Sequence, residues 1–301
     1  MGMFSPERQG ELLIIGQALI WALFPVIAKI SYGSLSPLYF AGISVLFGAL
    51  FFILVSFLRG NFSEWRKTES YVPILISTLC IGVLYYGLFF IGLQYTSAGN
   101  AVIVLQAEIF FTILTLRLWN KEKLSKWQIA GSLLIVLGVL AIFLQQGFTP
   151  RKGDILLLIA SLMPPIGNYY AKEARKYVSS TCILLFRNFF SGMIFLLAAV
   201  LFFPLPSSKM VTDSFLFLLI NGFLLFGLTK LMWVEAIHRI FIGKAISLSA
   251  IGPAFTLLYA FLFLKEIPTS GQIAGLVCMT FGVYFLTRNH EEKEKFTQNH
   301  Q

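Results

Sequence analysis

The run Gln128-Ile129-Ala130-Gly131 returns unchanged 144 positions later as Gln272-Ile273-Ala274-Gly275. It belongs to a longer match, free of gaps, between residues 99–139 and residues 243–283. A weaker match, displaced by 143, aligns the starts of the two segments through Gly10, Ala28 and Lys29 against Gly153, Ala171 and Lys172. The chain therefore consists of two related halves. In a membrane protein such a duplication usually builds a transport path at the interface between the halves.

Composition predicts that these halves lie in a membrane. Hydrophobic residues make up 57% of the chain, charged residues only 12%, and the mean hydropathy is +0.80, whereas an ordinary soluble domain carries about 25% charge. A helix needs roughly 20 apolar residues to cross the hydrocarbon core. Ten such stretches are predicted, at about 11–30, 37–58, 71–92, 98–118, 126–144, 153–171, 180–203, 213–237, 242–264 and 268–287. Because none alternates as a strand does, we expect an all-α polytopic membrane protein.

The distribution of the +9 net charge indicates a membrane orientation and gives no reason to expect a nucleic-acid partner. With the N terminus inside, 16 of the 23 Lys and Arg residues fall on the cytoplasmic side and 5 on the outer side. The positive-inside rule therefore predicts that both termini lie in the cytoplasm. The expected location of the protein is the inner (plasma) membrane. Each half holds five spans, an odd number, so the second half is expected to enter the bilayer inverted. The predicted organisation is a cytoplasmic N terminus (1–10), a first repeat (11–144), an inverted second repeat (153–287) and a cytoplasmic tail (288–301).

Charged residues inside the spans are the first candidates for a functional site. Glu108 lies near the middle of the fourth span, Arg187 in the seventh and Lys230 in the eighth, where each charge costs about 2.5–3.5 kcal/mol unless it is matched. They either line a water-filled cavity that binds a charged solute or relays protons, or they neutralise one another between helices. Glu235 and Arg239, four residues apart, are typical of an ion pair at a helix end.

Helix-breaking residues point to the same region. Pro164-Pro165 interrupts the sixth span and is followed by Asn168 and Tyr169, while the ninth span carries Gly252-Pro253 and the first carries Pro25. Interrupted helices in matching positions mark the site in many transporters, although such breaks also occur as packing kinks.

Aromatic residues supply further candidates for the wall of this site. Tyr86, in the pair Tyr85-Tyr86, could contact a substrate, and Trp233 follows Lys230 by one helical turn, on the same face. Tyr residues also belong to interfacial belts, which is the alternative for this pair.

One pattern occurs in both halves: residues 88–101 (LFFIGLQYTSAGNA) with Glu108 and Lys121-Glu122, and a second copy that runs from Trp233 to Lys265-Glu266. This pattern resembles the EamA repeat of the drug/metabolite transporter superfamily. The resemblance implies ten helices in two inverted repeats, a central cavity, and alternating access for small metabolites, often amino acids and their derivatives. The usual Glu-Pro pair of the first copy is Glu108-Ile109 here, so the fourth span is expected to be straighter than in the family.

We therefore expect a secondary active transporter that exports or exchanges a small polar metabolite, an amino acid or a derivative. Its partners are the substrate, the lipid bilayer, and a proton or a counter-substrate. Substrate-binding roles are predicted for Glu108 as the protonatable group, for Arg187 and Lys230 as an anion-attracting pair, and for a wall that comprises Tyr86, Asn168, Tyr169 and Trp233. No catalytic residue, metal site or cofactor is predicted, since the sequence holds no phosphate-loop motif and no His/Glu metal cluster. The alternatives are a membrane-embedded enzyme and a lipid-translocating or accessory subunit.

Overall fold

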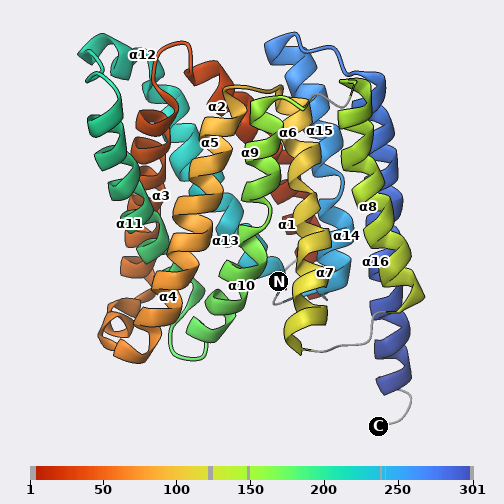
Figure 1. Ribbon diagram of the computed structural model, residues 1–301. Helices are drawn as coiled ribbons and strands as arrows, with labels where there is room; N and C mark the ends of the chain where they lie inside the picture. Colours follow the sequence, from red (N-terminus) through yellow and green to blue (C-terminus); the bar gives the residue numbers. More distant parts are fainter. Residues whose placement is uncertain (1–4, 121–124, 148–149, 238, 241, 299–301) are drawn as a thin grey trace.

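The computed structural model describes residues 5–120, 125–147, 150–237, 239–240 and 242–298, and the regular elements within them are helices (Figure 1). In chain order these are α1 (Pro6–Trp21), α2 (Phe24–Ser31), α3 (Pro37–Arg59), α4 (Tyr71–Ser77), α5 (Tyr86–Leu93), α6 (Ala98–Leu105), α7 (Ala107–Asn120), α8 (Lys126–Gln145), α9 (Lys152–Ala160), α10 (Met163–Ala174), α11 (Ser180–Phe202), α12 (Ser208–Leu219), α13 (Thr229–Ile237), α14 (Ile242–Ser249), α15 (Gly252–Tyr259) and α16 (Ser270–Gln298). Three π-helical segments, η3 (Thr78–Tyr85), η4 (Ile220–Leu228) and η5 (Ala260–Leu264), continue α4, α12 and α15, and two short 3₁₀ helices, η1 (Asn61–Arg66) and η2 (Thr68–Ser70), precede α4.

Seven helical stretches of the described chain are long and apolar enough to cross a bilayer, by length and composition. They are Pro6–Ser31, Pro37–Arg59, Thr68–Leu93, Ala98–Thr115, Lys126–Gln145, Ser180–Phe202 and Ser208–Ile237, and two shorter apolar helices follow them at Gly252–Leu264 and Ser270–Leu286. Large apolar side chains cover the outside of the bundle, as at Leu58 (82% exposed) and Phe202 (77% exposed). Lipid, and not water, suits such a surface. The chain is therefore an all-helical, multi-pass membrane protein.

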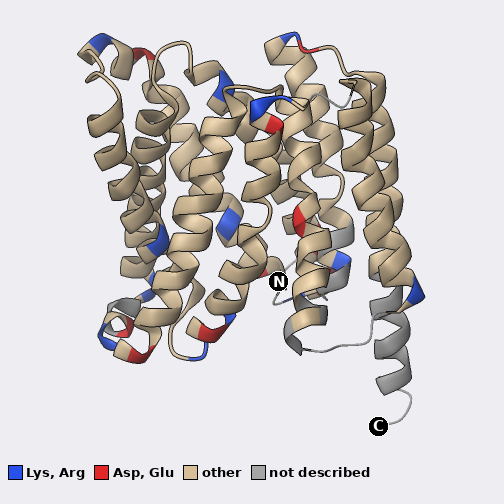
Figure 2. Cartoon of the chain, viewed as in Figure 1, with Lys and Arg blue, Asp and Glu red and all other residues tan. Residues whose placement is uncertain are grey.

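Most Lys, Arg, Asp and Glu positions of the described chain lie toward the two ends of the bundle, and few lie at mid-height (Figure 2). After the end of α13, Arg239 Nη1 lies 3.0 Å from Glu235 Oε2, which confirms the predicted ion pair at the helix end. Arg59, at the end of α3, joins the same carboxylate at 2.8 Å from Oε1. This cluster ties α3 to α13.

The last helix continues beyond the predicted end of its span at residue 287. α16 runs to Gln298, through a segment rich in Glu and Lys, residues with high helix propensity. The end of an apolar stretch is therefore not the end of the helix.

Helices α8 and α16 pack against each other through glycines that the duplication relates. A Cβ atom on Gly131 would lie 2.6 Å from the carbonyl oxygen of Gly282, and one on Gly138 would lie 3.0 Å from that of Gly275. Gly275 is the counterpart of Gly131, and Gly282 that of Gly138, each displaced by 144. The contact is therefore reciprocal, as at an interface with two-fold symmetry, and the two helices run antiparallel. Only residues without a side chain permit so close an approach of two backbones.

The helices that begin the two halves also pack in equivalent ways. A Cβ on Gly153, in α9, would meet the carbonyl oxygen of Gly92, and one on Gly10, in α1, would lie 3.4 Å from the carbonyl oxygen of Ala236. Positions 92 and 236 differ by 144, and positions 10 and 153 by 143. The internal repeat is thus a repeat of tertiary packing as well as of sequence.

In the part of the chain that the structure describes, four helical stretches are interrupted, and they fall in equivalent spans of the two halves. α1 gives way to α2 at Ala22, α9 to α10 at Ser161, α6 to α7 at Gln106, and α14 to α15 at Ala250. Proline follows three of these breaks at the first turn of the next helix, where its missing N–H is tolerated. The break at Gln106 has no such proline. The Gln106 N–H nevertheless donates to Ile103 O, three residues back. This stretch is therefore interrupted at Gln106 although Ile109 stands in place of the proline. That it is straighter than in the family stays a prediction.

Candidate functional site

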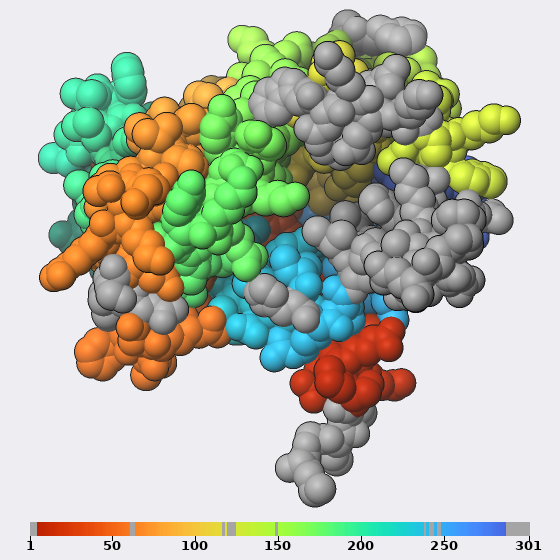
Figure 3. Space-filling model, turned by 90° about the horizontal axis from the view of Figure 1, so that it is seen from below, coloured from red at the N-terminus to blue at the C-terminus, as the bar shows by residue number. Residues whose placement is uncertain are grey.

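A cavity of about 600 Å³ lies within the bundle, with walls from α1, η3, α5, α7, α10, α11 and α13. Seen from below, the molecule is hollowed beside the green segment that contains α10 (Figure 3). A second cavity, of about 230 Å³, adjoins the first, and the two share Gln17, Trp21, Tyr85, Glu108 and Trp233 in their walls. The larger cavity falls in the size range of sites for small organic ligands.

The helix breaks surround these cavities. Ala22, Gln106 and Ala250 line the smaller cavity, and Pro164, just after the break before α10, lines the larger one. A break frees backbone carbonyls, and at membrane depth these groups need protein or water as partners. The hydroxyl of Thr256, in α15, supplies one such partner by donating to the carbonyl oxygen of Ala22 at 3.0 Å.

Six of the seven predicted site residues line the larger cavity; they are Tyr86, Glu108, Asn168, Arg187, Lys230 and Trp233. Tyr169 lines neither cavity. Its side chain is 44% exposed, and its ring lies edge-on to that of Tyr170, with 5.3 Å between centroids. Successive residues of a helix point about 100° apart, so α10 directs Asn168 to the cavity and Tyr169 away from it.

The three charged residues share the cavity without forming an ion pair with one another. No N···O distance of 4.0 Å or less joins Glu108 to Arg187 or to Lys230 in the described structure. Arg187 is only 9% exposed, and its Nε atom is buried without a hydrogen-bond partner. A buried charge without a partner is costly. The interpretation that these groups neutralise one another therefore lacks the contacts that it requires.

Lys230 is instead covered by an aromatic ring. Its Nζ atom lies 3.4 Å from the ring centroid of Trp21, in α1, a cation–π contact worth about 2 kcal/mol when it is desolvated. Trp21 also stacks on Phe24, with 4.6 Å between centroids, and Phe24 stacks on Phe89 at 4.6 Å. The Trp21 ring therefore belongs to the cavity wall and to the aromatic core.

Trp21, Gln17, Lys172 and Arg175 are among the residues of the larger cavity that the sequence-based prediction of the site misses. Trp21 stands out in the sequence only as a neighbour of the break in the first span, and Gln17, 7% exposed, carries no local signal in an apolar helix. Lys172 and Arg175 line the larger cavity near the end of α10. In the sequence they count only among the basic residues that indicate the membrane orientation. The alignment of Lys172 with Lys29 in the other half is the one signal that could have singled it out.

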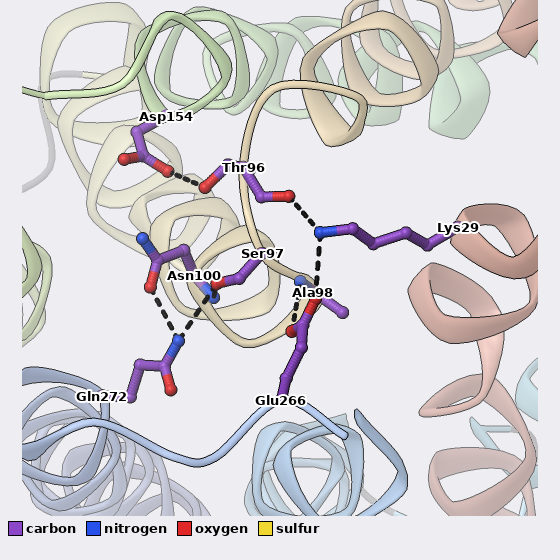
Figure 4. A network of polar contacts seen from close by, with 8 residues as sticks. All are labelled: Lys29, Thr96, Ser97, Ala98, Asn100, Asp154, Glu266 and Gln272. Atoms are coloured by element: carbon purple, nitrogen blue, oxygen red, sulfur yellow. Dashed lines mark hydrogen bonds and ion pairs between the residues drawn. The ribbon is translucent and has the colours of Figure 1, made fainter. Parts of the chain in front are cut away.

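The end of the bundle opposite to the hollow is held together by an ion pair between the halves (Figure 4). Lys29 Nζ, in α2, lies 2.9 Å from Glu266 Oε1, and it also donates to the carbonyl oxygen of Thr96. Glu266 Oε2 accepts the N–H of Ala98 at 2.9 Å, at the start of α6, where the helix dipole favours a negative charge. One carboxylate thus holds α2 and α6 together.

A second set of hydrogen bonds reinforces the same end (Figure 4). Gln272 Nε2, in the first turn of α16, donates to Asn100 Oδ1 at 2.8 Å and to Ser97 Oγ at 3.1 Å. The hydroxyl of Thr96 donates to the carboxylate of Asp154, in the first turn of α9. Four helices from both halves, α2, α6, α9 and α16, therefore meet at this closed end.

The backbone before Glu266 adopts an unusual conformation that aims its side chain. Lys265 has a φ of +59°, and it is the one non-glycine residue of the described chain with a positive φ. This left-handed residue ends η5, and the N–H of Glu266 then donates to Ala260 O at 3.1 Å. Side chains other than glycine, Asn and Asp rarely adopt this conformation, which makes it a candidate for a functional constraint.

Comparison with known proteins places the chain in a family. The EamA-like transporter family matches it twice, over residues 8–144 and 151–288. The chain belongs to this family. The two matches correspond to the two halves that the internal repeat defines.

Relatives of this EamA protein carry transporter names. It is 25% identical to an uncharacterized transporter, YoaV, of Bacillus subtilis (strain 168), over 91% of this chain and 95% of that one. It is 26% identical to a protein of Escherichia coli (strain K12) named "Probable amino-acid metabolite efflux pump", over 92% and 94% of the two chains. A solved crystal structure with 16% identity superposes with a TM-score of 0.68 over 95% of this chain and 99% of that one, which shows a shared fold. The EamA family and these relatives point to a transporter rather than an enzyme.

Proposed function

We propose that this EamA protein is a secondary active transporter that moves a small polar metabolite, an amino acid or a derivative, across the inner membrane by alternating access. Its site is the larger cavity, and the substrate contacts Glu108, Arg187 and Lys230. One observation carries the proposal: two adjoining cavities, which four interrupted helices line between them, hold charged groups that form no ion pair with one another. Such charges are tolerated within a membrane protein where water or a substrate contacts them.

The proposed topology has ten spans in an inverted five-plus-five arrangement, with both termini in the cytoplasm. The reciprocal glycine contacts between α8 and α16 support it, because a two-fold relation between the halves generates such contacts. In this arrangement the hollow end of the bundle faces the cytoplasm, and the end that Lys29 and Glu266 hold together faces outward. The structure is then the inward-open state of an alternating-access cycle.

Glu108 is the proposed coupling residue. It lines both cavities, so a proton bound to it would change the charge of the whole site. Trp233 and Tyr86 line the larger cavity beside it and are proposed to contact the apolar part of the substrate. Asn168, from α10, supplies a hydrogen-bonding group to the same cavity, whereas Tyr169, which lines neither cavity, is not proposed as a contact.

Transport by the purified protein tests this function. The protein is reconstituted alone into liposomes, and uptake of labelled amino acids and their N-acyl or deaminated derivatives is followed with an imposed pH gradient and in exchange against internal unlabelled compound. Saturable uptake of one of these compounds supports the proposal. Absence of gradient-driven uptake and of exchange across the whole panel would contradict it and would favour an accessory subunit that needs a partner chain.

A further inference from the structure

The proposed transport cavity has a strong excess of positive charge. Among the described residues, four basic ones line it, Lys172 and Arg175 near its mouth and Arg187 and Lys230 deeper within, against the one carboxylate of Glu108. Cavities lined by charge of one sign concentrate ligands of the opposite sign, since low-dielectric walls focus the field. The excess thus indicates the charge of the substrate as well as the position of its site.

None of these four cations is in direct contact with a carboxylate of the described chain. No ion pair within 4.0 Å involves Lys172, Arg175, Arg187 or Lys230, whereas Lys29, which lies at the closed end, is paired with Glu266. Lys230 rests on the Trp21 ring, 3.4 Å from its centroid, which shields one side of the ammonium group and leaves its other donors to the cavity. The two deeper cations are therefore ready to donate to an anion.

The remaining walls of the cavity are apolar and aromatic. Trp21, Tyr85 and Tyr86 stand on one side, and Ile183 and Leu184, in α11, are among the aliphatic residues of the lining. A ligand that fills this space gains by burying apolar surface as well as by pairing its charge. An inorganic anion would use only the charged part of the site.

We infer that the substrate is a small organic carboxylate with a net negative charge and a planar apolar body, whose carboxylate binds between Arg187 and Lys230. This inference rests on the proposed function and narrows it to one charge class. A zwitterion would bring an ammonium group into a cavity with four cations and one carboxylate, which opposes its binding. Lys172 and Arg175 attract the anion to the mouth.

A series of ligands that differ mainly in charge tests this inference. The probes are 3-phenylpropionate (an anion), L-phenylalanine (a zwitterion), 2-phenylethylamine (a cation) and 3-phenylpropanamide (neutral), with acetate as an anion without the apolar body. Dissociation constants are measured by calorimetry with the full-length protein in nanodiscs at pH 7 and two salt concentrations. We expect 3-phenylpropionate to bind at least about tenfold more tightly than the zwitterion, the cation and the amide, since one charge-assisted hydrogen bond contributes that order of affinity. It should also bind more tightly than acetate, which lacks the apolar surface that the cavity walls bury. Equal or tighter binding of the zwitterion, the cation or the amide, or no binding of 3-phenylpropionate, would overturn the inference.

Variants locate the anion within the cavity. Arg187→Gln and Lys230→Gln should each weaken 3-phenylpropionate at least about tenfold, and Arg187→Lys should restore part of the loss because it keeps the charge. Lys172→Gln should have a smaller effect that disappears at high salt, as expected of a screened charge at a solvated mouth. Lys209→Gln, an exposed position at the start of α12 outside the cavity, is the matched control and should bind as the wild type does. Unchanged affinity in both glutamine variants would remove these residues from the anion site.

Exchange in liposomes separates this inference from the proposed function. If a zwitterion exchanges and 3-phenylpropionate does not bind, the protein is a transporter and the inference is wrong. If 3-phenylpropionate binds as expected and no compound exchanges, the anion site stands and the proposed function is wrong.

Discussion

Removal of the charge on Glu266 should loosen the closed end of the bundle. Glu266→Gln keeps the size of the side chain and an oxygen that can still accept the Ala98 N–H, but it removes the carboxylate that faces Lys29 at 2.9 Å. The two side chains are 27% and 23% exposed, so this ion pair is partly buried. Its contribution should therefore lie between that of exposed ion pairs, about 0.2–1 kcal/mol, and that of buried hydrogen bonds to charged groups, about 1.5–3 kcal/mol. We therefore expect the closed arrangement to lose about 1–2 kcal/mol, which raises the population of the open form about 5–30-fold.

The opening can be measured as the reactivity of one cysteine. Gln106 lines the smaller cavity, so Gln106→Cys is introduced into a chain in which Cys80, Cys182 and Cys278 are replaced by serine. A membrane-impermeant thiol reagent is added outside intact cells. When opening is fast relative to labelling, the labelling rate follows the population of the open form, so Glu266→Gln should raise the rate about 5–30-fold.

Two further variants make this experiment decisive. Lys152→Gln, an exposed lysine at the same end of the bundle, should leave the labelling rate unchanged. Exchange of the two charges, Lys29→Glu together with Glu266→Lys, should restore slower labelling, although the new lysine cannot accept the Ala98 N–H. Wild-type labelling in Glu266→Gln, or labelling in the exchanged pair as fast as in the single variant, would refute the role of this ion pair.

Three other predictions follow from the same structure. Glu108→Gln should abolish uptake driven by a pH gradient and leave exchange measurable in liposomes, because the amide cannot carry the proton; equal loss of both activities would indicate structural damage instead. Gly131→Ala would put a Cβ 2.6 Å from the carbonyl oxygen of Gly282 and should destabilise the protein by about 1–3 kcal/mol, which would lower the midpoint of thermal unfolding in detergent. Gly33→Ala, whose Cβ would have its nearest neighbour at 3.7 Å, is the control and should leave the midpoint unchanged. Similar midpoints for the two variants would argue against the close packing of α8 and α16. Lys265→Val should lower the same midpoint, since a β-branched residue fits the left-handed φ of +59° poorly, whereas Lys265→Gly should not. A Val variant as stable as the Gly variant would mean that this backbone conformation is not required.

Much of the fold could be predicted because the signals that encode it are local or repeated. Apolar runs separated by polar residues predict membrane helices, and the shift of 144 by itself relates Gly131 to Gly275. The charged candidates were found for a similar reason, because a charge within an apolar span is rare and costly. Six of the seven predicted residues line one cavity.

Other features depend on contacts that no local pattern contains. The direction of Tyr169 depends on the rotation of α10 about its axis, and the sequence of one helix leaves this rotation open. Gln106 interrupts its helix without proline or glycine, so no breaker residue predicts the break. Lys29 and Glu266 are 237 positions apart. In the sequence, Lys29 is a residue near the end of a span, and Glu266 belongs to the repeated Lys-Glu pair. Their meeting at the closed end follows from the packing of one half on the other.

The sidedness of two equivalent loops tests the central claim, that the halves cross the membrane in opposite directions around one cavity. Gly60 follows α3 and Phe203 follows α11, the helices that occupy equivalent positions in the two halves. Single cysteines at these positions are labelled with an impermeant reagent in intact cells and in inverted vesicles. The account predicts that position 60 reacts only in inverted vesicles and position 203 only in intact cells; reaction of both from the same face would contradict it.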